Sequence, residues 1–200
     1  MMERPAPFDV RPVVLEGRYV RLEPLGEQHL DELYEAARDA EIWRYMTWPG
    51  PRDREGMREF LDDALSTDAR GLQVPFAQVD VASGRAIGST RFFDVLPSVR
   101  ALEIGYTWIG KEAWGTRLNP EAKLLLMTHA FETLGAQRVQ LKTDARNGRS
   151  QAAMAKLGFK REGIIRRHML LPDGHLRDSV YFSVLDDEWP AVKEGLAARI

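Results

Sequence analysis

Residues 114–123 combine a turn with the start of a helix, and this segment could bind an anion. The segment reads Trp-Gly-Thr-Arg-Leu-Asn-Pro-Glu-Ala-Lys and follows an apolar strand pattern. The first backbone N–H groups of a helix have no partner within it, and with the helix dipole they attract negative charge. We therefore predict that the amides of residues 116–119 hold a pyrophosphate. Every helix has such an end, so the prediction gains weight only from the neighbouring elements.

A strand and a long helix must flank this segment to position it. Residues 101–109 alternate in a way that predicts a strand with four large side chains on one face. These are Leu102, Ile104, Tyr106 and Trp108. Glu103 falls on the opposite face. Asn119 suits the N-cap of the helix, Pro120 suits its first position and Gly135 suits its end.

The rest of the pattern predicts one mixed α/β domain over residues 1–200, in which residues 1–12 form an N-terminal extension. Expected strands cover residues 13–25, 74–81, 86–95, 101–109, 138–143, 159–171 and 178–185. Expected helices cover residues 26–38, 52–66, 119–134, 147–157 and 189–200. This order surrounds a central sheet with helices.

The composition excludes several classes of function. The chain has no cysteine, which rules out disulfides, a thiolate nucleophile and a cysteine zinc site. Its four histidines show no metal-ligand spacing, so no metal is expected. A net charge of -2 argues against a general nucleic-acid binder. No apolar run approaches the ~20 residues of a membrane span, and no secretory signal is visible, so we expect a cytoplasmic protein without membrane attachment.

The charges are unevenly distributed along the chain. Residues 23–68 contain 13 acidic and five basic residues, whereas residues 138–177 contain ten basic and three acidic residues. Solvated surfaces explain such runs in most proteins. Alternatively, the basic part could hold a polyanionic cofactor and the acidic part could attract a cationic substrate.

Several segments, in this order and spacing, resemble the GNAT superfamily of acetyl-coenzyme A-dependent N-acetyltransferases. The likeness is greatest to the RimJ/RimL-like branch, which acetylates the N-termini of ribosomal proteins. The segments that carry it are residues 15–25, 103–106, 114–123, 147–150, 156–159 and 161–163. The resemblance implies a three-layer fold with a mostly antiparallel, twisted central sheet of about seven strands. It also implies acetyl-CoA as co-substrate.

The sequence departs from the family pattern at several positions. The family's pyrophosphate loop has Gln or Arg where Trp114 stands, Gly where Arg117 stands and a small residue at Asn119. Arg117 could crowd a phosphate or could pair with it. Many members carry a general-acid tyrosine where this chain has Met154. That role is vacant or is filled by another residue.

The resemblance also implies how the residues would act. Glu103 is the candidate base for the acceptor amine, acting through water. A backbone N–H near Tyr106 would stabilise the thioester oxygen in the transition state. Ser150 resembles a serine of some Rim-type enzymes that serves the departing thiolate. Structural alternatives remain open, because Glu103 could be an ordinary strand carboxylate and Ser150 an ordinary helix residue.

The implied coenzyme contacts come from the strand, the loop and the helix after residue 146. They are Tyr106, Thr107, Trp108, Gly115, Thr116, Arg117, Leu118, Asn119, Asn147 and Arg149. For the acceptor, the resemblance implies contacts from the first helices and the last hairpin, namely Trp43, Trp48 and Tyr181. The acceptor is an amine, either a protein N-terminus or a small molecule such as a polyamine, amino acid or antibiotic. A coenzyme-binding sensor without catalysis and assembly as a homodimer also stay open.

Overall fold

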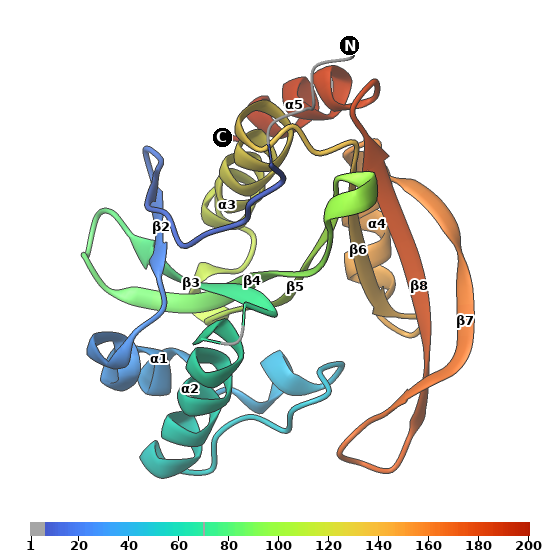
Figure 1. Ribbon diagram of the computed structural model, residues 1–200. Helices are drawn as coiled ribbons and strands as arrows, with labels where there is room; N and C mark the ends of the chain where they lie inside the picture. Colours follow the sequence, from blue (N-terminus) through green and yellow to red (C-terminus); the bar gives the residue numbers. More distant parts are fainter. Residues whose placement is uncertain (1–6, 70) are drawn as a thin grey trace.

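A single twisted sheet of eight strands runs through the molecule in the computed structural model, which describes residues 7–69 and 71–200 (Figure 1). The strands are β1 (Leu15–Glu16), β2 (Val20–Pro24), β3 (Gln73–Asp80), β4 (Ala86–Leu96), β5 (Ala101–Ile109), β6 (Arg138–Asp144), β7 (Lys160–Leu170) and β8 (Leu176–Leu185). Their order is β1-β2-β3-β4-β5-β6-β8-β7. Every neighbouring pair is antiparallel except β5 and β6, which are parallel.

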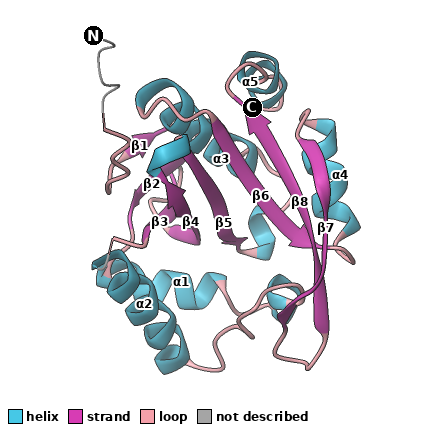
Figure 2. Ribbon diagram, turned by 45° about the vertical axis from the view of Figure 1, so that its right-hand side comes forward, coloured by secondary structure: helices cyan, strands magenta, loops and turns pink. Residues whose placement is uncertain are grey.

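Helices cover both faces of the sheet and complete the three layers (Figure 2). The α-helices are α1 (Leu30–Ala36), α2 (Arg54–Ala69), α3 (Leu118–Thr128), α4 (Gly148–Lys156) and α5 (Trp189–Ala197). Short 3-10 turns cover Glu27–His29, Ala40–Trp43, Pro97–Val99 and Lys111–Ala113, and a π-helical turn, His129–Thr133, continues α3. One apolar core joins the sheet to α3, α4 and α5, and a second joins it to α1 and α2. The mixed fold with a mostly antiparallel sheet is therefore confirmed.

The sheet forks between β5 and β6. The two strands pair over three residues only, the last pair being Glu103 with Gln140. Beyond that pair they diverge, as Figure 1 shows. The remaining length of β5 therefore has no strand partner on its β6 side, and its backbone N–H and C=O groups can bind an extended ligand there.

A bulge in β5 overturns the predicted alternation. Tyr106 and Thr107 face the single residue Thr90 of β4, and Tyr106 has a positive φ of 50°. The extra residue reverses which face the following side chains reach. Leu102 and Ile104 thus join the core under α3, as predicted, but Trp108 joins the core under α1 and α2.

The structure also corrects some element boundaries. The chain from residue 13 to 25 forms two short strands, β1 and β2, because it turns at residues 17–19. Helix α3 begins at Leu118 with Arg117 at the N-cap, so Asn119 lies inside the first turn and is not the cap. By contrast, the side chain of Asn147 caps α4, since its Oδ1 accepts a hydrogen bond of 3.1 Å from the Ser150 amide.

Candidate active site

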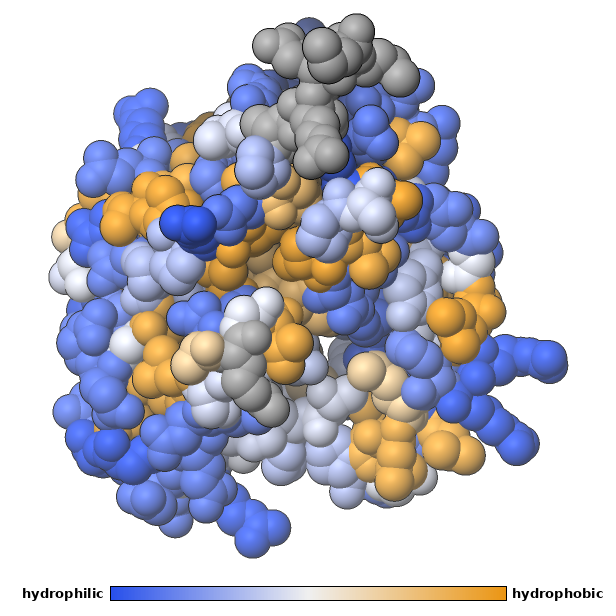
Figure 3. Space-filling model, viewed as in Figure 1, coloured by the Kyte–Doolittle hydropathy of each residue, from blue (hydrophilic) through white to orange (hydrophobic). Residues whose placement is uncertain are grey.

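The fork opens into a cleft of about 910 Å³ that passes between β5 and β6. In space-filling view the surface is hollowed near the middle of this face (Figure 3). One part of the cleft, which we call the coenzyme arm, is lined by the loop before α3 and by α4. The other part, which we call the acceptor arm, is lined by Glu41, Ile42, residues 44–47, Glu103, Lys142, Met169 and Arg177.

The loop before α3 offers backbone donors to the coenzyme arm. Among the described residues, the amides of Gly115, Arg117 and Asn119 have no hydrogen-bond partner. Those of Thr116 and Leu118 make only long bonds of 3.4 Å, to the carbonyl of Ala113 and to the Thr116 hydroxyl. Gly115 has a φ of 74°, which favours glycine, and a β-carbon there would meet no atom within 4 Å. The loop can therefore approach an anion closely.

The side chain of Arg117 does not fill this cradle. Its Nη1 donates a 2.8 Å hydrogen bond to the Tyr19 hydroxyl, and the guanidinium lies 5.5 Å from the Tyr19 ring centroid. Neither Arg117 nor Leu118 lines the cleft. The crowding of a phosphate by Arg117, considered from the sequence, is thus absent.

Two cations border the coenzyme arm. The Arg149 guanidinium stacks 4.0 Å from the ring centroid of Trp114, whose indole N–H donates to the Ile109 carbonyl at 3.0 Å. This stack joins α4 to the loop before α3. Lys123, one turn into α3, also lines the cleft, and burial lowers its pKa to about 8. The sequence does not single out Lys123, because a lysine on a helix gives no sign of which side faces a cleft.

Glu103 lies at the apex of the fork. Its side chain is buried, with Oε1 2.9 Å from the Lys142 ammonium and Oε2 accepting 2.9 Å from the Gln140 amide. Burial raises the pKa of Glu103 above its ordinary value, although Lys142 and Gln140 act in the opposite direction. A carboxylate whose pKa lies above the ordinary range is better suited to accept a proton near neutral pH.

Lys142 is a site residue that sequence reasoning did not select. Besides Glu103, its ammonium lies over the rings of Phe93 (4.7 Å) and Tyr181 (5.7 Å). The signal was present in the sequence, since Gln140 and Lys142 share one face of β6. What was missing was the pairing of β6 with β5, which brings that face to Glu103.

Helix α4 brings Asn147, Ser150 and Met154 to the cleft. Ser150 is half-buried, and its amide is bound by the Asn147 side chain. Met154, at the position of the family's tyrosine, is 4% exposed and packs in the core beside α3. It cannot donate a proton, so within α4 the hydroxyl that lines the cleft is that of Ser150.

The aromatic residues predicted for the acceptor side lie elsewhere. Trp43 is buried, donates its indole N–H to the Ala37 carbonyl at 2.8 Å and packs against Trp48 and Trp108. Trp43 and Trp48 belong to the core under α1 and α2 and do not line the cleft. The ring centroid of Tyr181 lies 5.7 Å from the Lys142 ammonium. The structure therefore does not bring Trp43 and Trp48 to an acceptor.

The acidic segment 23–68 also turns away from the cleft. Its carboxylates make ion pairs on the outer surface, such as Glu27 with Arg58 (2.9 Å). Of its carboxylates, that of Glu41 borders the cleft, and it is held 2.9 Å from the Lys111 ammonium. An acidic acceptor site built from this segment is thus not what the structure presents.

Within residues 7–69 and 71–200, no cluster of three or more histidine, aspartate or glutamate side chains could hold a metal ion. None of the helices there has the length and apolar character that crossing a membrane requires.

Comparison with known proteins places the chain in a family. The acetyltransferase (GNAT) domain matches residues 20–160. The putative ribosomal N-acetyltransferase YdaF of Bacillus subtilis (strain 168) is 38% identical over 94 residues, 47% of this chain and 50% of that protein. The ribosomal protein uS5-alanine N-acetyltransferase of Escherichia coli (strain K12) is 30% identical over 121 residues, 60% of this chain and 61% of that protein. These matches span less than two thirds of either relative's length.

A solved structure extends the likeness over nearly the whole chain. The GCN5-related N-acetyltransferase from Brucella melitensis is 35% identical and superimposes with a TM-score of 0.89, covering 95% of this chain and 86% of that one. The family match, over residues 20–160, includes both β5 and the loop before α3. The chain therefore belongs to the GNAT family of N-acetyltransferases and resembles its RimJ/RimL-like branch.

Proposed function

We propose that this enzyme transfers an acetyl group from acetyl-CoA to a primary amine, by direct attack of the amine on the thioester. The observation that carries the proposal is the forked cleft with unpartnered amides at its coenzyme arm. The residues fit the coenzyme, because Gly115, Arg117 and Asn119 present free N–H groups at the start of α3. The unpaired edge of β5 would bind the amides of the pantetheine arm.

In this proposal each polar group of the cleft has one task. The bound thioester supplies an activated acetyl carbon. Glu103 accepts the amine proton through a water molecule, and Lys142 and Gln140 hold its carboxylate in place. A backbone N–H at the β5 bulge, by Tyr106, donates to the carbonyl oxygen as it gains charge. When the C–S bond breaks, the Ser150 hydroxyl donates a hydrogen bond to the departing thiolate, which takes its proton from solvent.

The finer part of the proposal concerns the acceptor. An α-amino group, with a pKa near ~8, is easier to deprotonate than a lysine side chain near ~10.4. The two curated relatives described above are named for ribosomal substrates, which supports a protein N-terminus. A small amine remains the second candidate.

Release of thiol from acetyl-CoA, measured with a panel of N-terminal peptides and small amines, tests the proposal. Turnover that depends on an added amine, with a product heavier by one acetyl group, is the expected result. Tight coenzyme binding without turnover on any acceptor would instead indicate a sensor and would overturn the proposal.

Asn119→Asp should weaken coenzyme binding at least about tenfold at low ionic strength, because it puts a negative charge beside the diphosphate. The dissociation constant of CoA, measured by calorimetry, checks this. Added salt at about 0.5 M should shrink the deficit by screening. Gln137→Glu introduces the same charge at an exposed position outside the cleft and is the matched control. Equal affinities of Asn119→Asp and the wild type at low salt would place the diphosphate elsewhere.

Ser150→Ala should lower kcat by about 10–100-fold and leave the KM for acetyl-CoA nearly unchanged, if the hydroxyl serves the thiolate. The substitution is clean, because Asn147 and not the Ser150 side chain caps α4. Steady-state kinetics and a thermal melt measure the two effects. An unaltered kcat, or a lower melting temperature alone, would assign Ser150 a structural role.

A further inference from the structure

In the acceptor arm, the carboxylates are already in ion pairs, whereas two positively charged side chains are not. Glu103 is paired with Lys142, and Glu41 with Lys111. Arg44 and Arg177, which also line this arm, have no carboxylate partner among the described residues. An acceptor entering the cleft therefore meets two arginines whose charge is not balanced by an ion pair.

Arg177, on β8, is the more enclosed of the two, because it is buried whereas Arg44 is exposed. Its side chain reaches from the hairpin to the 41–47 segment, with Nη1 donating 3.1 Å to the Tyr45 carbonyl and Nε donating 3.1 Å to the Ser179 hydroxyl. The residue is 6% exposed. Nη2 has no partner among the described residues and is not sealed from solvent, so it is available from the cleft.

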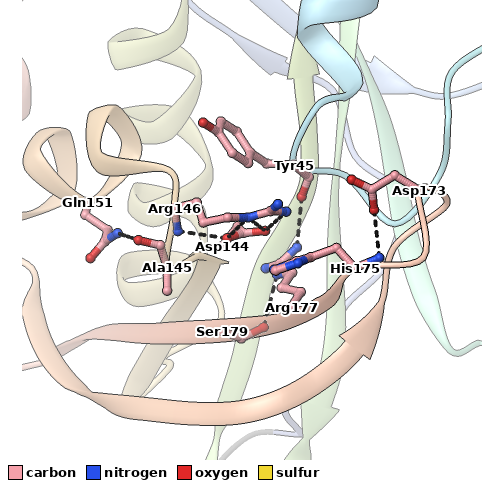
Figure 4. A network of polar contacts seen from close by, with 9 residues as sticks. All are labelled: Tyr45, Asp144, Ala145, Arg146, Gln151, Asp173, His175, Arg177 and Ser179. Atoms are coloured by element: carbon pink, nitrogen blue, oxygen red, sulfur yellow. Dashed lines mark hydrogen bonds and ion pairs between the residues drawn. The ribbon is translucent and has the colours of Figure 1, made fainter.

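The Asp144 carboxylate, which lies beside Arg177 (Figure 4), makes its ion pair with Arg146 instead. Asp144 is buried and is held by Arg146, which donates to both of its oxygens and lies 2.8 Å from Oδ2. Figure 4 shows that Asp144 and Arg146 lie beside Arg177 but are bonded to each other. Burial lowers the pKa of Arg177, which is the sign of a guanidinium that has lost water without gaining a full counter-charge.

We propose that Arg177 is a carboxylate-binding subsite, so that the acceptor carries a carboxylate close to its reactive amine. This inference rests on the proposed function. A guanidinium already fixed through Nε and Nη1 is preorganised, and it can give its remaining N–H groups to a carboxylate at little entropic cost. Glu103 and Arg177 line the same cleft. One molecule can thus place its amine toward Glu103 and its carboxylate on Arg177.

The same arrangement disfavours polyamines. A second ammonium on the acceptor would meet Arg177 and Arg44, and like charges in a partly desolvated cleft repel. The structure therefore selects acidic peptides or amino acids over the cationic acceptors that the acidic segment 23–68 suggested.

Matched peptides test the proposal with the full-length protein. Ala-Asp-Ala-amide and Ala-Asn-Ala-amide differ by one charge, as do Ala-Ala-Asp-amide and Ala-Ala-Asn-amide, and spermidine serves as the cationic acceptor. We expect kcat/KM to be at least about tenfold higher for one aspartate peptide than for its asparagine partner. Arg177→Gln should bring that ratio close to one, and because the ratio is taken within each peptide pair, any loss of kcat/KM common to both peptides does not enter it.

Controls separate this effect from misfolding. Arg161→Gln removes the same charge from an exposed position of β7 outside the cleft and should leave the ratio unchanged. Arg177→Lys keeps the charge and should retain part of the preference. The subsite is refuted if, in the wild type, the kcat/KM ratio of aspartate to asparagine peptide is near one for both pairs. It is also refuted if Arg177→Gln leaves that ratio unchanged, or if spermidine is the preferred acceptor.

The test is distinguishable from failure of the proposed function. If no acceptor releases thiol, the acetyl-transfer proposal fails, and the subsite is then judged by binding. Calorimetry of CoA-loaded protein should show that an aspartate peptide binds more tightly than the matching asparagine peptide. Equal binding of the two peptides would refute the carboxylate subsite.

Discussion

Glu103→Gln should lower kcat by about 10²–10³-fold at about pH 7, the range expected for loss of a positioned base. Glutamine has the size of glutamate and can still accept the hydrogen bond from Gln140, so the fork should keep its shape. What disappears is a group that can take the amine proton. The KM for acetyl-CoA should change little, because Glu103 lies at the apex of the fork and outside the loop before α3.

The loss should depend on pH in a defined direction. Burial places the pKa of Glu103 above its ordinary value, so the base is formed as the pH rises through that pKa, and the wild-type rate rises with it. At higher pH the free amine becomes abundant without help. The deficit of Glu103→Gln should therefore be greatest near neutrality and should shrink at alkaline pH.

A pH–rate profile of kcat/KM for wild type and variant provides the measurement. Glu112→Gln makes the same charge change at an exposed position just before the loop and serves as the control. If Glu103→Gln loses the same factor at every pH, or loses nothing, Glu103 is a structural carboxylate paired with Lys142.

The local signals of the sequence were sufficient for most of the architecture. The apolar pattern of α3 and the strand pattern of β5 up to its bulge are properties of contiguous residues. The family resemblance then supplied their arrangement. The eighth strand arose because one expected strand, residues 13–25, turns and becomes β1 and β2.

What the sequence could not provide depends on contacts between distant segments. The bulge at Tyr106 exists because β5 has one more residue than β4 across from it, and only the register between the strands reveals this. Trp43 looked suited to a ligand, but the fold places it where Trp48 and Trp108 enclose it. In the same way, Arg177 gained its place in the acceptor arm from its contact with Tyr45, 132 positions away.

Glu121 gives the clearest example of such a contact and the largest expected effect on stability. From the first turn of α3, its buried carboxylate accepts three backbone hydrogen bonds from the turn between β1 and β2: from Arg18 (2.8 Å), Tyr19 (2.6 Å) and Val20 (2.7 Å). Gly17 completes the arrangement, since a β-carbon there would lie 2.7 Å from the carboxylate. The turn and α3 are thus joined by one side chain.

Glu121→Ala should lower the free energy of unfolding by about 3–4 kcal/mol, because three amides lose a charged acceptor and Val20 has no water to replace it. For a chain of this size, a loss of that magnitude corresponds to a fall in melting temperature of roughly 6–16 °C. Glu121→Gln keeps one acceptor oxygen, so its melting temperature should lie between those of the wild type and Glu121→Ala. Calorimetry or a thermal melt measures both, with the exposed Glu112→Ala as the control.

The same substitution should also weaken coenzyme binding, although Glu121 does not line the cleft. The turn that Glu121 holds includes Tyr19, whose hydroxyl accepts the hydrogen bond from Arg117 in the loop before α3. When the turn is released, the loop loses that anchor, and its free amides must be ordered again on binding. A variant that melts within about 2 °C of the wild type and binds CoA equally well would show that the three hydrogen bonds hold neither the turn nor the loop.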